Sequence, residues 1–348
     1  MNFRRVAVAA AAVFASTFLV TAAPASAASD KPGTCRDIAV PVALSDGGPQ
    51  DNTVAATLCT PSAWAPGEHR IDVLVAGATY NRTYWDWPQD PQADSYVDLT
   101  LAAGRATFNF DRLGTGSSSR PASSALTVSS DAYVLHQLIG WVRGQGYSQV
   151  NGAGHSLGSV TLTNEASRWH DLDRLVVTGI IHLPAVGLTS TAFFASLYPA
   201  ALDPKFAGKG LDPGYLTTVP DRRGPAFYDP KTADSTVIAY DESNKDLATV
   251  GEVSESATAL LAPVALSSAR SITAPVLIVM GANDDIFCNL VVSCQTADSI
   301  VANEAPYYSG AADFDALVVP GTAHNLPLHP SAPSSFQKIN NWIETGSA

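Results

Sequence analysis

The stretch VNGAGHSLGSVTLTNEASRW, from Val150 to Trp169, contains the pattern Gly-x-Ser-x-Gly at residues 154–158. Val150–Ala153 is predicted to be a short strand, and Leu157–Trp169 a helix that follows it directly. In this context the motif forms a sharp turn that projects the serine hydroxyl from the sheet, and its glycines allow close approach of the backbone. Ser156 is therefore the candidate nucleophile.

A nucleophilic serine needs a histidine base, and the base needs a carboxylate that orients it. Asp284 follows the apolar run Val276–Met280, and His324 follows the run Ala316–Val319. Both runs are predicted to be buried strands, so each of these side chains sits on a loop at a strand's carboxyl end. The residues predict a triad of Ser156, Asp284 and His324. Asp285 remains the alternative acid and His329 the alternative base.

Outward from this motif, apolar runs alternate with helical patterns, which favours an α/β fold with helices on both faces of a sheet. We expect further strands at 35–44, 53–60, 71–76, 106–110 and 175–181, and helices at 94–103, 131–142 and 334–343. The segment from about 183 to 269 breaks the alternation, because it lacks a buried-strand run and is rich in aromatic residues. A long insertion of this kind predicts a mainly helical cap between two strands.

Two further motifs support a family resemblance. Asp111–Ser117 (DRLGTGS) is similar to a D-x-x-G-x-G-x-S loop, and Gly281–Asp284 (GAND) to a G-x-x-D acid loop. With the Gly-x-Ser-x-Gly motif, they make the chain resemble the α/β-hydrolase superfamily, and within it secreted actinobacterial serine hydrolases and esterases. The resemblance covers nearly all of residues 28–348. It implies a mostly parallel central sheet flanked by helices, and it favours Asp284 over Asp285.

The resemblance also implies an oxyanion hole made of two backbone N–H groups. One is that of Leu157, directly after the nucleophile, and the other is that of Ala78, after the third strand. Ala76 stands where the family has a histidine, but the donor is a backbone amide, so the hole can survive this replacement.

The substrate pocket is expected to include Tyr80, Trp85 and His182. The alternative for the two aromatic residues is packing within their own loop. His155, inside the serine motif, is expected to pack beside the site rather than to act in catalysis.

The first 27 residues have the pattern of a secretory signal peptide. Arg4 and Arg5 precede an apolar run from Val6 to Val20, and Ala25–Ala27 matches a small-x-small cleavage site. We therefore expect one hydrolase domain over residues 28–348, located outside the cell.

Export makes disulfides possible for the four cysteines, which allow three pairings. The most local pairing, Cys35–Cys59 with Cys288–Cys294, is the one we predict.

Composition excludes several classes of protein. The 348 residues carry 20 Lys and Arg against 32 Asp and Glu, a net charge of −12. This balance argues against a nucleic-acid partner and against attachment to an anionic membrane. No cluster has convincing metal-ligand spacing and no dinucleotide-binding motif follows a strand, so neither a metal nor a cofactor is expected. We expect a monomer without stable membrane insertion.

Together, these features predict a serine hydrolase that cleaves a small hydrophobic ester or lactone through an acyl-enzyme intermediate. A lactonase is one alternative. A small-peptide peptidase is another, with Asp234, Asp241 and Glu242 available to bind a free amino terminus. A non-catalytic binding protein is a third, but such a protein would be expected to have lost a triad member.

Overall fold

The computed structural model describes Met1, residues 31–67, 69–183, Phe193, and residues 195–288 and 292–347. The chain divides into two compact units, Met1–Lys31 and Pro32–Ala348. Apart from Met1, the predicted signal peptide lies outside the described residues. Everything that follows concerns the second unit.

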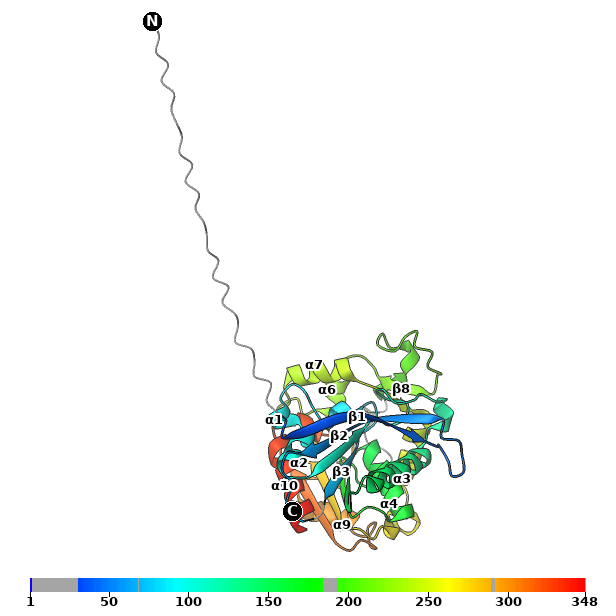
Figure 1. The fold of residues 1–348 in the computed structure, drawn as a ribbon, viewed down its shortest axis with the longest axis vertical. Helices are drawn as coiled ribbons and strands as arrows, with labels where there is room; N and C mark the ends of the chain where they lie inside the picture. Colours follow the sequence, from blue (N-terminus) through cyan, green and yellow to red (C-terminus); the bar gives the residue numbers. More distant parts are fainter. Residues whose placement is uncertain (2–30, 68, 184–192, 194, 289–291, 348) are drawn as a thin grey trace. The chain divides into compact units, whose positions relative to one another are not determined.

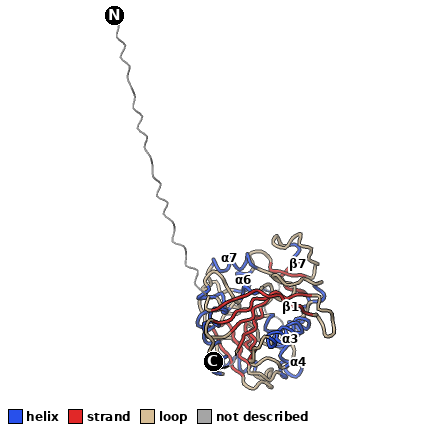
Figure 2. The backbone as a smooth tube through the Cα atoms, in the orientation of Figure 1, coloured by secondary structure: helices blue, strands red, loops and turns tan. Residues whose placement is uncertain are grey.

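An eight-stranded sheet forms the centre of this unit (Figures 1 and 2), with the order β1-β2-β4-β3-β5-β6-β10-β11. β1 and β2 pair antiparallel, as do β2 and β4, whereas every later pair is parallel. The strands are β1 (Gly33–Val42), β2 (Asn52–Pro61), β3 (Arg70–Val75), β4 (Ala106–Phe110), β5 (Gln149–His155), β6 (Arg174–Thr178), β10 (Val276–Gly281) and β11 (Phe314–Val319).

Helices cover both faces of the sheet. α3 packs against α4, and α2 packs against α10; Figure 1 shows the two pairs on opposite sides of the strands. The helices outside the cap are α1 (Pro91–Asp94), α2 (Tyr96–Ala102), α3 (Val128–Gly144), α4 (Leu157–Trp169), α9 (Ala297–Glu304) and α10 (Ala332–Thr345). Short 3-10 turns lie at Arg82–Tyr84, Ser123–Ala125, Ala200–Leu202, Val264–Leu266, Ser268–Ser271 and Leu326–Leu328. No described helix is long and apolar enough to cross a membrane.

Burial explains the strand patterns. Every residue of β10 is buried, as expected for a central parallel strand covered on both faces. The expected strand at 175–181 ends earlier, at Thr178. Gly179 follows with φ 66°, a left-handed conformation that cannot continue a strand.

The insertion between β6 and β10 contains helices α6 (Arg223–Phe227), α7 (Ser235–Asn244) and α8 (Val250–Leu260). It also contains a small antiparallel sheet, of β7 (Leu197–Pro199), β8 (Tyr215–Thr218) and β9 (Ala248–Thr249), that the sequence did not predict. These strands are two to four residues long, too short to show an alternating pattern. Residues 184–192 and 194 of the expected cap lie outside the described residues.

Both predicted disulfides are formed. Cys35 lies directly opposite Cys59 in the β1–β2 pair, and Cys288 is bonded to Cys294 just after the loop that carries Asp284.

Removal of the first bridge by a Cys35→Ala/Cys59→Ala double substitution should destabilise the fold. The bond closes a loop with a sequence separation of 24, and loop-closure entropy for this length is worth roughly 3 kcal/mol. Urea unfolding should show this decrease in the free energy of unfolding as a lower midpoint. An unfolding midpoint equal to that of the wild type would contradict the expectation.

Candidate active site

Ser156 lies at the turn between β5 and α4 in a strained conformation. Its φ of 52° and ψ of −120° are rare for a residue with a side chain, and it is one of four non-glycine residues with positive φ in the described part of the chain. Its N–H donates to the carbonyl of Thr178 on the neighbouring strand, at 2.9 Å. The strain is thus held by pairing with β6, and the side chain stays half-buried.

The two glycines of the motif are required by space. A Cβ at Gly158 would lie 2.2 Å from the carbonyl oxygen of Val75 in β3. A Cβ at Gly154 would lie 2.7 Å from the Cα of Ser159. Neither position can hold a larger residue without moving backbone, which is why α4 can pack directly against β3 and β5.

Asp284 and His324 meet although they are 40 residues apart. Nδ1 of His324 lies 2.9 Å from Oδ2 of Asp284, and both side chains are buried. The other carboxylate oxygen of Asp284 accepts from the N–H groups of Ile286, at 2.9 Å, and Phe287, at 3.4 Å. The carboxylate is therefore fixed by its own loop and can hold the imidazole in one orientation.

The alternative acid and base are placed differently. Asp285 is exposed. His329 is buried, its Nδ1 lies 2.7 Å from the carbonyl oxygen of Asn325, and its Nε2 accepts from the N–H groups of Asp229 and Ala323. Since both ring nitrogens of His329 are engaged with backbone, it has no nitrogen left to act as a base.

No hydrogen bond joins Ser156 to His324, both of which belong to the described residues. Both nevertheless lie close to His155. A Cβ at Gly179 would touch the rings of His155 and His324, and one at Gly77 would lie 3.2 Å from the Cβ of Ser156. Such contacts are often long in the absence of a substrate.

The loop after β3, the predicted oxyanion loop, approaches Ser156 closely at Gly77. Within the described part of the chain, the N–H groups of Ala78 and Leu157 donate to no acceptor. Both residues line the same cavity as Ser156. Two unused backbone donors next to a serine hydroxyl are the arrangement that stabilises an oxyanion.

The family model described as "Alpha/beta hydrolase family" matches residues 73–334, about three quarters of the chain. The chain belongs to this family. The predicted fold is thereby confirmed, with its mostly parallel central sheet and flanking helices. A comparison with curated proteins found no match.

Solved structures of the same fold include three hydrolases. An enol-lactonase from Burkholderia xenovorans LB400 has a TM-score of 0.56 and 15% identity, covering 87% of this chain and 99% of its own. A monoacylglycerol lipase from Paleococcus ferrophilus has a TM-score of 0.55 and 16% identity, and the match covers 85% of this chain and 100% of the lipase. A putative aryl esterase from Burkholderia cenocepacia has a TM-score of 0.58 and 16% identity, and the match covers 89% of this chain and 98% of the esterase. At these identities the likeness concerns the fold.

A buried arginine, Arg112, bonds to the loop after β3, the predicted oxyanion loop of this family member. Arg112 donates to the carbonyl oxygens of Ala76 and Gly77, each at 3.2 Å, and to that of Leu247 in the cap, at 3.3 Å. It also pairs with Glu252 on α8. Arg112 lies in the DRLGTGS motif, but the motif gave it no role and could not reveal partners as distant as Glu252.

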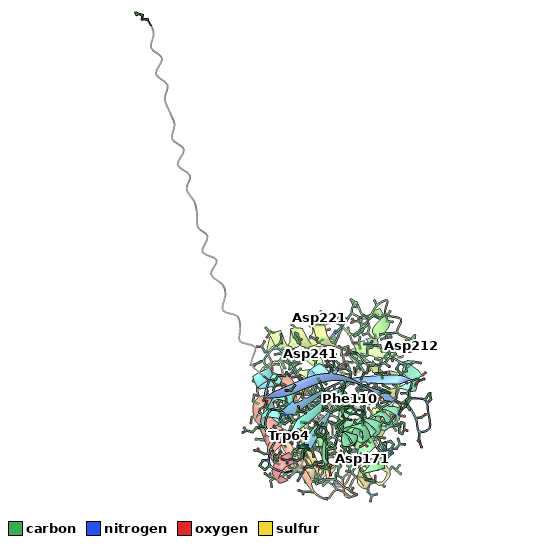
Figure 3. The ribbon with its side chains drawn as sticks, viewed as in Figure 1. Trp64, Phe110, Asp171, Asp212, Asp221 and Asp241 are labelled. Atoms are coloured by element: carbon green, nitrogen blue, oxygen red, sulfur yellow. A yellow bond between two sulfur atoms is a disulfide. The ribbon has the colours of Figure 1, made fainter. Side chains whose placement is uncertain are left out.

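A second buried arginine, Arg223 of the cap, was missed by the sequence analysis. It forms a two-pronged pair with Asp241 of α7, with both nitrogen–oxygen distances 2.9 Å, and it donates to Oγ1 of Thr79 at 2.9 Å. Figure 3 labels Asp241 on the cap. Thr79 is buried with φ 62°, and its backbone exchanges hydrogen bonds with Asp246 and Leu247. The cap and the oxyanion loop are thus bonded at several points.

The cavity that contains Ser156 is almost wholly apolar. Besides Ser156, its lining consists of Ala78, Leu157, Val160, Ile180, Phe193, Val253, Ser256, Ala257, Leu260, Ile286 and Phe287. The hydroxyl of Ser256, on α8, is buried and has no hydrogen-bond partner among the described residues. It is a polar atom that the described part of the cap contributes to this cavity.

The three predicted pocket residues do not belong to this lining. The Tyr80 hydroxyl lies 3.1 Å from a carboxylate oxygen of Asp241 and accepts from Asn325. Trp85 is buried against its neighbour Tyr84 and against α2. His182 lines an adjacent cavity, and its Nδ1 lies 2.8 Å from the carboxylate of Glu304. These three side chains therefore lie outside the described lining of the cavity that contains Ser156, and their part in substrate binding stays a prediction.

His155 is buried beside His324, the predicted base. Its ring stacks on Tyr84 with centroids 4.5 Å apart and lies 4.7 Å from the ring of His324. The hydroxyl of Thr178 donates to the carbonyl of Gly154, so it accepts from Nδ1–H of His155 at 3.1 Å. His155 is thus a neutral packing residue in this arrangement.

His155 should make the fold sensitive to acid. Burial, with a smaller contribution from His324, lowers the pKa of His155 well below its ordinary value. Below about pH 6.5, His155 binds a proton in the unfolded chain but stays unprotonated in the folded protein. The free energy of unfolding therefore falls as the pH falls. Burial also lowers the pKa of His329, which acts in the same direction.

A His155→Gln variant should therefore lose less thermal stability than the wild type between pH 7 and pH 5. The comparison is of slopes, measured as Tm against pH. A His69→Ala variant, altered at an exposed histidine, serves as the control and should keep the wild-type slope. Equal slopes for all three proteins would show that His155 does not take up a proton on unfolding.

Proposed function

We propose that this protein is an extracellular serine hydrolase that cleaves a carboxylic ester of a small hydrophobic substrate. The observation that carries the proposal is the position of Ser156. It sits at a strained turn, in one cavity with the unused N–H groups of Ala78 and Leu157, and the ring of the preceding residue, His155, lies 4.7 Å from that of His324, which pairs with Asp284. The two disulfides are compatible with an extracellular location.

The proposed reaction has two halves. Ser156 attacks the substrate carbonyl while His324 takes its proton, and the N–H groups of Ala78 and Leu157 stabilise the oxyanion. His324 then gives the proton to the leaving alcohol, which leaves an acyl group on Ser156. Water, deprotonated by His324, releases the acid and restores the serine. Asp284 keeps the imidazole oriented and stabilises its positive charge throughout.

The apolar lining favours a hydrophobic acyl group. Burial of each methylene group against residues such as Ile180 and Leu260 is worth about 0.8 kcal/mol. The structural neighbours named as enol-lactonase, monoacylglycerol lipase and aryl esterase all act on ester or lactone bonds by name, which supports the same class of bond here. A lactone remains within the proposal, because its ring ester reacts through the same steps.

A peptidase finds less support, because the acidic groups that could bind an amino terminus are engaged. Asp241 pairs with Arg223, and Glu242 pairs with Lys245. Asp234 caps α7 by accepting from the N–H of Thr236.

The triad assignment predicts large losses of activity. Ser156→Ala and His324→Ala should each lower kcat for p-nitrophenyl esters by at least ~10³. Asp284→Asn should cause a large loss and Asp285→Asn a small one, since only Asp284 contacts the imidazole. A fluorophosphonate probe should label the wild type at Ser156 and leave Ser156→Ala unlabelled. Activity retained in Ser156→Ala, or absence of label on the folded wild type, would refute the nucleophile.

The apolar cavity predicts that its size limits the acyl chain. An Ala257→Trp substitution narrows the cavity from α8, so kcat/KM should fall at least about tenfold for an octanoate ester and much less for an acetate ester. Ser254→Trp, at an exposed position on the same helix, is the matched control. An equal loss for both esters in Ala257→Trp would place the acyl group elsewhere.

A further inference from the structure

Three side chains of metal-binding type meet where α3 passes the end of α4. They are His136 on α3, Glu165 on α4 and Asp171 just after α4, and one ligand atom from each lies within 4.8 Å of the others. Nδ1 of His136 lies 2.6 Å from Oδ2 of Asp171 and 3.6 Å from Oε1 of Glu165. Figure 3 labels Asp171 on the side of the sheet that carries α3 and α4. Nine residues of helix separate Glu165 from Ser156, roughly 13 Å, so this cluster is distinct from the active site.

Apart from Nδ1 of His136, at 3.6 Å, and the neighbouring carboxylate of Asp171, no described charged group compensates the burial of Glu165. Its side chain is fully buried, and neither of its carboxylate oxygens forms a hydrogen bond within the described part of the chain. One oxygen of Asp171 is likewise buried without a partner. A buried carboxylate is costly unless it is paired, bound to a metal or protonated.

Nearby cations do not compensate these carboxylates. Among the described residues, His136 is the only basic side chain within ion-pair distance of Glu165 or Asp171. The guanidinium of Arg143 bonds instead to the main-chain oxygen of Asp171 and to the carboxylate of Asp173. Arg168 lies over the ring of Trp169. The cluster therefore presents two carboxylates and one imidazole, a charge of −2 when it is deprotonated.

We propose that His136, Glu165 and Asp171 form a binding site for one divalent transition-metal cation, best matched by Zn²⁺. Zinc takes imidazole nitrogen and carboxylate oxygen together at bond lengths of about 2.0–2.2 Å, whereas Ca²⁺ and Mg²⁺ prefer oxygen alone. A tetrahedral zinc site places its ligand atoms about 3.3 Å apart. The observed separations of 2.6 and 3.6 Å bracket this value, so small side-chain rotations suffice.

The surroundings suit a site that is open on one side. The His136 and Asp171 side chains are 34% and 21% exposed, which gives an ion access from the surface to the buried Glu165. The His136 ring stacks on Trp169, with centroids 4.6 Å apart and planes inclined by 11°, which holds the imidazole in place. A bound cation would tie α3 to α4, so its role would be structural.

A proton competes with the cation for the same oxygens. Burial, together with Asp171, raises the pKa of Glu165 to about 10. Metal ligands bind in their deprotonated form, so the affinity for zinc should rise with pH.

Calorimetric titration of the untagged, EDTA-treated protein with ZnCl₂ tests the proposal, in two buffers of different ionisation enthalpy. We expect one zinc ion per chain, release of protons, and a Tm raised by about a few degrees when zinc exceeds its Kd a hundredfold. CaCl₂ and MgCl₂ at the same concentration should have no such effect. Absence of saturable zinc binding, or a response to Ca²⁺ or Mg²⁺ without one to Zn²⁺, would overturn the assignment.

Variants distinguish zinc bound at this cluster from zinc bound to histidines elsewhere on the surface. Glu165→Gln mimics the protonated acid, so the protein should fold while its affinity for zinc falls at least about tenfold. His136→Gln, at a partly exposed position, should lose affinity to a similar extent and decides the matter if Glu165→Gln fails to fold. His69→Ala removes an exposed histidine elsewhere and should bind zinc as the wild type does. Unchanged affinity in His136→Gln would overturn the proposal.

Discussion

The structure of the site depends on a close approach of backbone at the turn between β5 and α4. Gly158 lies against the carbonyl of Val75, and Gly154 against Ser159, with no room for a Cβ at either position. This contact lets α4 begin directly above β3, and it holds Ser156 in its strained conformation. The same contact brings the loop at Gly77 beside the serine. One steric constraint therefore sets the positions of both Ser156, the proposed nucleophile, and the proposed oxyanion donors.

Buried charge then connects this centre to the cap. Arg112 bonds to the carbonyls of the oxyanion loop and to Glu252 of α8, while Arg223 joins Thr79 to Asp241 of α7. Breaking one member of such a buried pair leaves an uncompensated charge, which costs about 3–5 kcal/mol. The cap is thus part of the framework that positions the backbone donors, besides supplying an apolar wall to the cavity.

The two ends of α4 illustrate opposite uses of buried polar groups. At its start, strain and unused N–H groups lie beside an open cavity, where a substrate can use them. Near its end, Glu165 is buried with carboxylate oxygens that no described group satisfies. A catalytic centre tolerates unsatisfied donors because the reaction supplies the acceptor. At a helix–helix interface no substrate provides the missing partner, so the carboxylates at Glu165 need a bound proton or cation.

The sequence by itself determined the fold class, the β-strands of the central sheet and the candidates Ser156, Asp284 and His324. Each rests on a local requirement of a few neighbouring residues, such as glycines at a tight turn or an apolar run before a polar loop. The sequence also suggested both disulfides, because the cysteines are near one another in the chain. Only the tertiary structure decided the lining of the cavity beside Ser156, which includes Val253 and Ala257 of the cap. It alone revealed the pairs Arg112–Glu252 and Thr79–Arg223, which are 140 and 144 residues apart. Such contacts depend on which faces of distant elements meet, and a local pattern of residue types carries no information on that.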